Sequence, residues 1–183
     1  MRFYLTLVAS ALGLCLVFGS ALCMAAGIVN DSNQPSVASE PASSGWTDTA
    51  HGVLINALGL TGIRYRYGGN SPETGFDCSG FVRYVFQQAA SLTLPHGARA
   101  LSQLGQMVPI EQLKPGDLVF FNTLKSAFSH VGIYLGDNRF IHAPSAGGGV
   151  HVVDMSDAYW VSRYNGARRI DTPQAVSPQN QPR

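Results

Sequence analysis

Cysteine is scarce in this sequence: three occur among 183 residues. Cys15 and Cys23 lie within the first 26 residues, and Cys78 is the third. There is no CxxC or HExxH pair, so the usual sequence signatures of a zinc site are missing. If the first 26 residues are removed, a disulfide is excluded as well, because Cys78 then has no partner. An unpaired cysteine in an exported chain is either buried and inert or kept for its chemistry.

The sequence also has few charged residues: Lys and Arg number 12, Asp and Glu number 11, and the formal net charge is +1. The basic residues are scattered along the chain rather than clustered. Nucleic-acid binding needs a basic stripe or patch, and this chain offers none. We therefore exclude DNA and RNA as partners. The sequence contains no internal repeat either.

The first 26 residues, MRFYLTLVASALGLCLVFGSALCMAA, form a long uncharged apolar run behind a single Arg. The small residues Ala25 and Ala26 close the run, which is the order of a secretory signal peptide cleaved after them. An uncleaved membrane anchor is the alternative, since the run exceeds the roughly 18 residues that span a bilayer. A lipid anchor is less favoured, because leucine and not a small residue precedes Cys15 and Cys23. We expect an exported chain that meets a membrane only through this leader, if the leader is uncleaved or lipidated.

Composition divides the rest of the chain into three parts. Residues 27–45, GIVNDSNQPSVASEPASSG, have no apolar periodicity and read as a flexible linker. Residues 172–183 have the same polar, proline-containing character and are expected to form a disordered tail. Residues 46–171 between them are long enough for one domain with a substantial core.

Two segments of this domain show helical periodicity. In the first, residues 46–60, the predicted apolar face consists of Val53, Leu54, Ala57 and Leu58. In the second, which begins at Cys78, the predicted apolar face consists of Phe81, Val82, Val85, Phe86 and Ala89. Asp77 directly precedes this second helix and is a predicted N-cap, which places Cys78 in the first turn.

Short apolar runs follow the helices. They are residues 118–121 (LVFF), 130–135 (HVGIYL), 139–143 (RFIHA), 150–155 (VHVVDM) and 167–170 (ARRI). Turn residues separate them, notably Pro115-Gly116-Asp117, Gly136-Asp137-Asn138 and Asn165-Gly166. Helices followed by consecutive short strands predict an α+β domain with an antiparallel sheet.

Cys78 and two histidines form the strongest candidate for chemistry. The positive end of a helix dipole and a neighbouring imidazolium both lower the pKa of a thiol, so we expect Cys78 to be a thiolate. A hairpin across residues 136–138 brings His142 to within a residue or two of His130. The three therefore read as nucleophile, base and orienting residue. The other histidines are more simply explained as polar residues without a role: His51, His96 and His151.

Several ordered blocks make the chain resemble a known family. They are YRYGG at 65–69, FDCSGFV at 76–82, LPHG at 94–97, LKPGDLVFF at 113–121, SHVGIYLG at 129–136, FIHAPS at 140–145 and YWVSRYNGARRI at 159–170. Together they resemble the NlpC-type, papain-like cysteine peptidases of the bacterial cell wall, over roughly residues 59–170.

The resemblance implies a papain-like fold and a murein stem-peptide endopeptidase that remodels the cell wall through an acyl-enzyme. The family's nucleophile, base and orienting residue fall on Cys78, His130 and His142. Its oxyanion tyrosine falls on Tyr65, with Tyr67 as the less favoured choice. The substrate-facing positions fall on Asp77 and Ser79, although Asp77 is equally well explained as a helix cap alone. No cofactor or metal is implied, and the expected location is the periplasm or cell envelope, or outside the cell.

The sequence departs from the family pattern at two positions, and other functions stay open. His96 stands where the family usually has Arg, and Leu101 stands about where it has Gln, which puts the details of substrate binding in doubt. The alternatives are an inactive module that binds murein peptides, an amidase or acyltransferase with the same triad, and a zinc protein with one Cys and two His ligands.

Overall fold

The computed structural model describes residues 44–123, 126–146 and 148–170. The predicted signal peptide 1–26, most of the predicted linker and the predicted tail 172–183 lie outside these residues. None of the helices in the described ranges is both long enough and apolar enough to cross a membrane.

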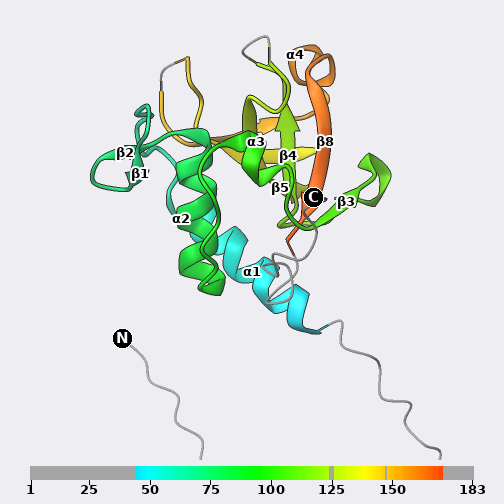
Figure 1. The fold of residues 1–183 in the computed structure, drawn as a ribbon, viewed down its shortest axis with the longest axis horizontal. Coiled ribbons are helices and arrows are strands. Elements are labelled where there is room, and N and C mark those ends of the chain that lie inside the picture. Colours follow the sequence, from blue (N-terminus) through cyan, green and yellow to red (C-terminus); the bar gives the residue numbers. More distant parts are fainter. Residues whose placement is uncertain (1–43, 124–125, 147, 171–183) are drawn as a thin grey trace, which may run out of the picture. The chain divides into compact units, whose positions relative to one another are not determined.

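Figure 1 shows the order of the helices and strands. The helices are α1 (Ser44–Gly59), α2 (Cys78–Ala90), α3 (Ala98–Leu101), the short 3-10 helix η1 (Ile110–Gln112) and α4 (Ala158–Val161). The strands are β1 (Asn70–Ser71), β2 (Gly75–Phe76), β3 (Gln106–Val108), β4 (Leu118–Phe121), β5 (His130–Gly136), β6 (Arg139–His142), β7 (His151–Asp154) and β8 (Tyr164–Arg169).

Six of the eight described strands form one sheet in the order β3-β8-β4-β5-β6-β7, and every pairing in it is antiparallel. Strands β1 and β2 form a separate two-stranded ribbon. Helix α2 packs against both α1 and β5 (Figure 1). The predicted α+β class with an antiparallel sheet is confirmed.

Helix α2 forms where the sequence predicts it. The Asp77 carboxylate accepts a hydrogen bond from the backbone N–H of Gly80, which caps the helix. The predicted apolar face is buried at Phe81, Val82, Val85 and Phe86. An apolar stripe at this spacing drives the helix against the sheet and fixes the direction in which its first turn points.

Strand β4 is buried on both faces, and its residues alternate between two cores. Leu118 and Phe120 belong to the core that contains residues of α1 and α2. Val119 and Phe121 belong to a second core, against which Trp160 of α4 packs. The run LVFF is apolar throughout because successive residues of a strand point to opposite faces and here both faces are covered.

An ion pair joins the beginning of β4 to the end of β8. The Asp117 side chain is fully buried, and its two oxygens accept hydrogen bonds from Nε and Nη2 of Arg169 at 2.8 and 2.7 Å. The backbone N–H of Lys114 donates to the same carboxylate at 2.8 Å. The two hydrogen bonds from Arg169 compensate the negative charge of Asp117, which would be costly to bury without a partner.

Three details differ from the sequence predictions. Helix α1 begins at Ser44, inside the predicted linker, and Leu58 is 47 % exposed because only the side facing α2 is covered. The predicted turn at 165–166 lies inside β8, where Gly166 has φ +107° and the register with β4 shifts. Strand β3 was not predicted, because two of its three residues are exposed and show no apolar alternation.

Candidate active site

Cys78 is the first residue of α2, and Asp77 ties that turn to a neighbouring loop. Oδ1 of Asp77 accepts hydrogen bonds from Gly80 N–H at 2.7 Å and from the Ser79 hydroxyl at 2.9 Å. Its Oδ2 accepts from the N–H of Gly68 at 3.0 Å. The predicted cap is therefore confirmed, and the same carboxylate also holds the loop that carries Tyr65 beside the start of the helix.

Glycine is required at position 80 by a close approach of backbone. A Cβ atom added to Gly80 would overlap the carbonyl oxygen of Gly69. The backbone N–H of Asp77 donates to that same oxygen at 3.0 Å. The glycines of the YRYGG and FDCSGFV blocks therefore let the 65–69 loop lie directly against the first turn of α2.

The two predicted histidines meet at the end of the β5–β6 hairpin. Ile133 pairs with Ile141, a register that sets His130 and His142 near each other on adjacent strands. Nε2 of His130 lies 2.7 Å from Nδ1 of His142. Their side chains are nearly inaccessible, at 3 % and 2 % exposure. The predicted proximity of the two rings is confirmed.

Cys78 and His130 line the same groove, which has a volume of about 310 Å³. The backbone of Val131, the residue after His130, lies close enough to the Cys78 thiol to lower its pKa. The groove therefore brings the start of α2 and the start of β5 together. It is also lined by five of the other residues singled out from the sequence: Tyr65, Tyr67, Asp77, Ser79 and His96.

Burial changes the protonation of this pair. It raises the pKa of the Cys78 thiol to about 11, and the negative charge of Asp77 adds to the effect, while backbone hydrogen bonds from Val131 and Ser79 oppose it. Burial lowers the pKa of His130 to about 4. Burial therefore favours the uncharged forms of both groups in the free site, which opposes the effect of the helix dipole on which the thiolate prediction rests.

The His142 imidazole is neutral as well. Burial lowers its pKa far below the usual value, and His130 and His151 lower it further. A neutral His142 can accept a hydrogen bond at Nδ1 from Nε2–H of His130, which leaves Nδ1 of His130 as the proton acceptor. This is the tautomer that a base acting on Cys78 needs.

Tyr65 borders the same groove as Cys78 and is close enough for the two side chains to interact electrostatically, whereas Tyr67 differs from it in exposure. Burial raises the pKa of the Tyr65 hydroxyl, and the nearby charges of Cys78 and Asp77 raise it further. Tyr67 also borders the groove but is 90 % exposed. Of the two tyrosines, only Tyr65 packs, as Cys78 does, against the core that contains residues of α1 and α2.

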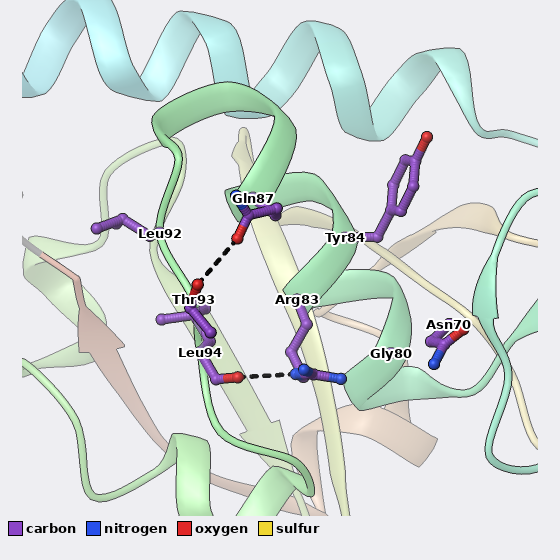
Figure 2. A pocket seen from close by; sticks show the side chains of 8 residues that line it. All are labelled: Asn70, Gly80, Arg83, Tyr84, Gln87, Leu92, Thr93 and Leu94. Atoms are coloured by element: carbon purple, nitrogen blue, oxygen red, sulfur yellow. Dashed lines mark hydrogen bonds between the residues drawn. The ribbon is translucent and has the colours of Figure 1, made fainter.

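The two departures from the family pattern lie in different surroundings. His96 borders the groove, and its Nδ1 lies 3.0 Å from Nη1 of Arg83. Figure 2 shows Arg83 of α2 reaching the Leu94 carbonyl, to which its Nε donates at 2.8 Å, beside a separate hollow of about 300 Å³. Leu101 is fully buried in the core. Only His96 can therefore bear on substrate binding.

Trp160 is a site residue that the sequence analysis did not single out. Its ring stacks on that of His130, with centroids 5.9 Å apart, and meets the edge of the His142 ring at 5.1 Å. It also borders a second hollow beyond His130. The only feature of the sequence that could have pointed to Trp160 as a site residue is its place in the family block YWVSRYNGARRI.

No group of three or more His, Cys, Asp or Glu side chains within residues 44–123, 126–146 and 148–170 is arranged to hold a metal ion.

Comparison with known proteins agrees with this geometry. The profile of the NlpC/P60 family matches residues 62–169. Murein DD-endopeptidase MepH of Escherichia coli is 40 % identical over 133 residues, covering 71 % of this chain and 48 % of MepH. Gamma-DL-glutamyl hydrolase of Bacillus subtilis is 45 % identical over 120 residues, covering 65 % of this chain and 29 % of the hydrolase. The chain thus spans about half or less of these two relatives.

Solved structures agree as well. An NlpC/P60 family protein from Bacillus cereus has a TM-score of 0.60 at 31 % identity, covering 66 % of this chain and 39 % of that protein. The peptidoglycan hydrolase RipB from Mycobacterium tuberculosis has a TM-score of 0.60 at 28 % identity, covering 70 % of this chain and 67 % of RipB. The predicted papain-like fold is confirmed by these neighbours.

Proposed function

Because this chain belongs to the NlpC/P60 family, we propose that it is a cysteine-type endopeptidase that hydrolyses the stem peptides of peptidoglycan. One observation carries the proposal. A groove joins Cys78, at the start of α2, to His130, whose far ring nitrogen lies 2.7 Å from His142. A nucleophile, a base and a group that orients the base are thus available in one place.

The first half of the reaction forms a thioester. The Cys78 sulfur attacks the carbonyl carbon of the scissile amide while its proton passes to Nδ1 of His130. The oxygen that becomes negative accepts hydrogen bonds from the Cys78 N–H and the Tyr65 hydroxyl. The C–N bond then breaks, and His130 gives its proton to the leaving nitrogen.

The second half releases the product. A water molecule attacks the thioester carbon as it loses a proton to His130, and the C–S bond breaks. The sulfur recovers the proton, which restores the neutral thiol and imidazole. His142 stays hydrogen-bonded to His130 throughout and stabilises the imidazolium that forms in each half.

A neutral Cys78–His130 pair supports this sequence of steps. Because burial favours the uncharged forms of both groups, the charges develop only as the sulfur attacks. The N–H groups at the start of α2 and the His142 ring are then already in position to stabilise them. Asp77 and Ser79 are proposed to contact the acyl half of the substrate, since both border the groove.

The proposed substrate and location come from the relatives and the leader. Curated relatives are named murein DD-endopeptidase and probable peptidoglycan endopeptidase LytE. The peptides of the cell wall lie outside the cytoplasmic membrane, so an enzyme that cuts them must be exported. The apolar run in residues 1–26 agrees with export. We therefore place the protein in the periplasm or cell envelope, with the residues between the leader and α1, 27–43, as a linker to the catalytic domain.

The test uses purified murein of defined composition and mass spectrometry of the released fragments. The wild-type protein should release peptides cut within the stem, and Cys78→Ser should release none while keeping the same circular dichroism spectrum. Hydrolysis by Cys78→Ala at the wild-type rate would refute the nucleophile. Fragments cut between sugar and peptide would show an amidase instead, and tight binding without release would show an inactive binding module.

A further inference from the structure

We propose that the hollow beside helix α2 in Figure 2 binds the C-terminal carboxylate of a short peptide, held by the Arg83 guanidinium. The proposal rests on the proposed function in one respect, because it identifies this peptide as a second stem peptide, one that is not being cut. The choice of a carboxylate follows from the residues that line the hollow. Such a site gives the enzyme a contact with the cell wall outside the groove of Cys78.

The hollow is separate from the catalytic groove. Its volume of about 300 Å³ is at the lower end of the range for small-molecule sites, roughly 300 to 1,000 Å³. No residue borders both the hollow and the groove of Cys78. A ligand in the hollow therefore leaves the groove open to the substrate. The lining that the argument uses consists of Asn70, Arg83, Gln87, Leu92, Thr93 and Leu94.

Arg83 has unused hydrogen-bond donors at this hollow. Its Nε donates to the Leu94 carbonyl at 2.8 Å, and its Nη1 lies 3.0 Å from Nδ1 of His96. A guanidinium has five N–H groups, so three remain without a partner among the described residues. In Figure 2 a terminal nitrogen of Arg83 points toward the Asn70 side of the hollow. These donors are open to a ligand, because the side chain is half-buried and not enclosed.

The positive charge of Arg83 is also uncompensated. Among the described residues, no carboxylate lies within ion-pair distance of Arg83. The lining of the hollow contains no Asp or Glu either. An arginine binds a carboxylate through two parallel, charge-assisted hydrogen bonds, which are stronger than those between neutral groups. The hollow therefore suits a planar anion with two oxygens, which is a carboxylate.

The other walls suit the rest of an amino acid residue. The Thr93 hydroxyl donates to Oε1 of Gln87 at 3.1 Å, so the amide NH₂ of Gln87 is left as a donor. Leu92 and Leu94 add apolar surface that a small aliphatic side chain can cover. A peptide that ends in alanine offers this combination. Tyr84 points toward α1 in Figure 2, so its hydroxyl is not part of the proposed contact.

Arg83 also joins the hollow to the catalytic groove. An arginine only donates hydrogen bonds, so Nδ1 of His96 accepts in their contact. His96 borders the groove of Cys78. Arg83 thus contacts both the ligand of the hollow and a residue of the groove, which places the second stem peptide next to the one that is being cut.

The test titrates the backbone amide NMR signals of the purified Cys78→Ser protein with three probes: N-acetyl-D-alanine, its carboxamide and inorganic phosphate. N-acetyl-D-alanine should shift the signals of Gln87, Thr93 and Leu94. It should also bind about 10- to 100-fold more tightly than the carboxamide, which has no charge for Arg83 to bind. Equal binding of acid and carboxamide, equally tight binding of phosphate, or shifts confined to the groove would each overturn the proposal.

Two neighbouring substitutions on α2 locate the site. Gln87→Glu adds a negative charge to the lining of the hollow and should weaken the binding of N-acetyl-D-alanine about 10-fold or more. Gln88→Glu is the matched control, because Gln88 is also exposed and does not border the hollow. Surface substitutions of this kind change stability little, so both variants should fold. An equal loss in both variants, or a loss in neither, would contradict the placement.

A third substitution tests the arginine itself. Arg83→Gln should weaken the binding of N-acetyl-D-alanine about 10- to 100-fold. Arg99→Gln is its control, because Arg99 is exposed and borders neither the hollow nor the groove. Unchanged affinity in folded Arg83→Gln would overturn the proposal. If Arg83→Gln does not fold, the comparison of Gln87→Glu with Gln88→Glu decides, since both keep Arg83.

The two proposals fail separately, because binding is measured without hydrolysis and hydrolysis without the probes. If the wild type cuts murein within the stem but N-acetyl-D-alanine does not bind, the further inference fails and the proposed function stands. If Cys78→Ser cuts murein as fast as the wild type, the proposed function fails. The identification of the ligand as a second stem peptide then fails with it, whereas binding of N-acetyl-D-alanine would still show a carboxylate site.

Discussion

The Nε2 atom of His130 lies 2.7 Å from Nδ1 of His142, and both rings are buried under Trp160. The contact joins two adjacent strands at the end nearest α2. One ring must donate in this contact and the other accept, so when His130 donates from Nε2, its Nδ1 is the nitrogen left to accept the proton of Cys78 in the proposed reaction.

Replacing His142 should slow the chemical step without preventing it. We expect His142→Ala to lower kcat about 10²- to 10³-fold, because His130 then loses the group that holds its tautomer, and His130→Ala to lower it further. His142→Gln, whose amide oxygen can still accept a hydrogen bond, should recover part of the loss. Steady-state kinetics on a murein peptide measures this, and an unchanged kcat in His142→Ala would disprove the orienting role.

Removing the Tyr65 hydroxyl should weaken stabilisation of the oxyanion. We expect Tyr65→Phe to lower kcat about 10- to 10³-fold with little change in KM, since the contact matters most when negative charge develops. Tyr84→Phe removes a hydroxyl from a tyrosine that packs on Phe76 outside the groove, so it serves as the control. An equal effect of the two substitutions would argue against a catalytic hydroxyl at position 65.

Alkylation of Cys78 should follow the ionisation of a buried thiol. Because burial raises the pKa of Cys78 to about 11, the iodoacetamide rate should keep rising up to about pH 11. Mass spectrometry of the peptide that contains Cys78 distinguishes it from Cys15 and Cys23. A fast rate that is already constant at pH 6 would instead reveal a thiolate–imidazolium pair in the free enzyme.

The buried histidines should make the protein less stable in mild acid. Burial lowers the pKa of His130 from 6.5 to about 4, so the unfolded chain binds more protons between these values. The free energy of unfolding should therefore fall as the pH drops from about 6.5 to about 4, by about 1.4 kcal/mol per pH unit for a fully titrating histidine.

Urea unfolding at pH 7, 6 and 5 measures this dependence. His142→Asn removes one of the two groups whose pKa is lowered, so its stability should change less steeply with pH. A wild-type free energy of unfolding that is constant over this range would show that folding does not lower the pKa values of the two rings.

The buried ion pair should contribute far more to the free energy of unfolding than the exposed one. Asp117→Ala leaves Arg169 without its carboxylate and should cost about 3–5 kcal/mol of unfolding free energy. Arg139→Gln breaks the exposed pair with Asp137 and should cost less than about 1 kcal/mol. Chemical denaturation measures both, and similar losses would mean that burial is not the deciding factor.

Local sequence rules predicted the parts of the site that lie close together along the chain. Asp77 before an apolar stripe predicted the cap and the position of Cys78, since both depend on one helical turn. A short loop between two strands predicted the approach of His130 and His142, because antiparallel pairing sets the distance between residues on either side of a turn.

Other features depend on segments that are far apart in the sequence. Trp160 reaches His130 only because α4 and β5 pack on the same core. The turn expected at Gly166 became a bulge because β8 pairs with β4, and no local pattern distinguishes the two. The hollow next to His142 is likewise formed by residues from β5, β6, β7 and α4.

The sequence by itself determined which residues are candidates for the chemistry and which of them come close together, because caps, periodicity and turns act over a few residues. Only the tertiary structure sets how strongly burial acts on the charges of those residues. The pKa of a thiol or an imidazole depends on how much water the whole fold removes from it, and for Cys78 and His130 this loss favours the uncharged forms.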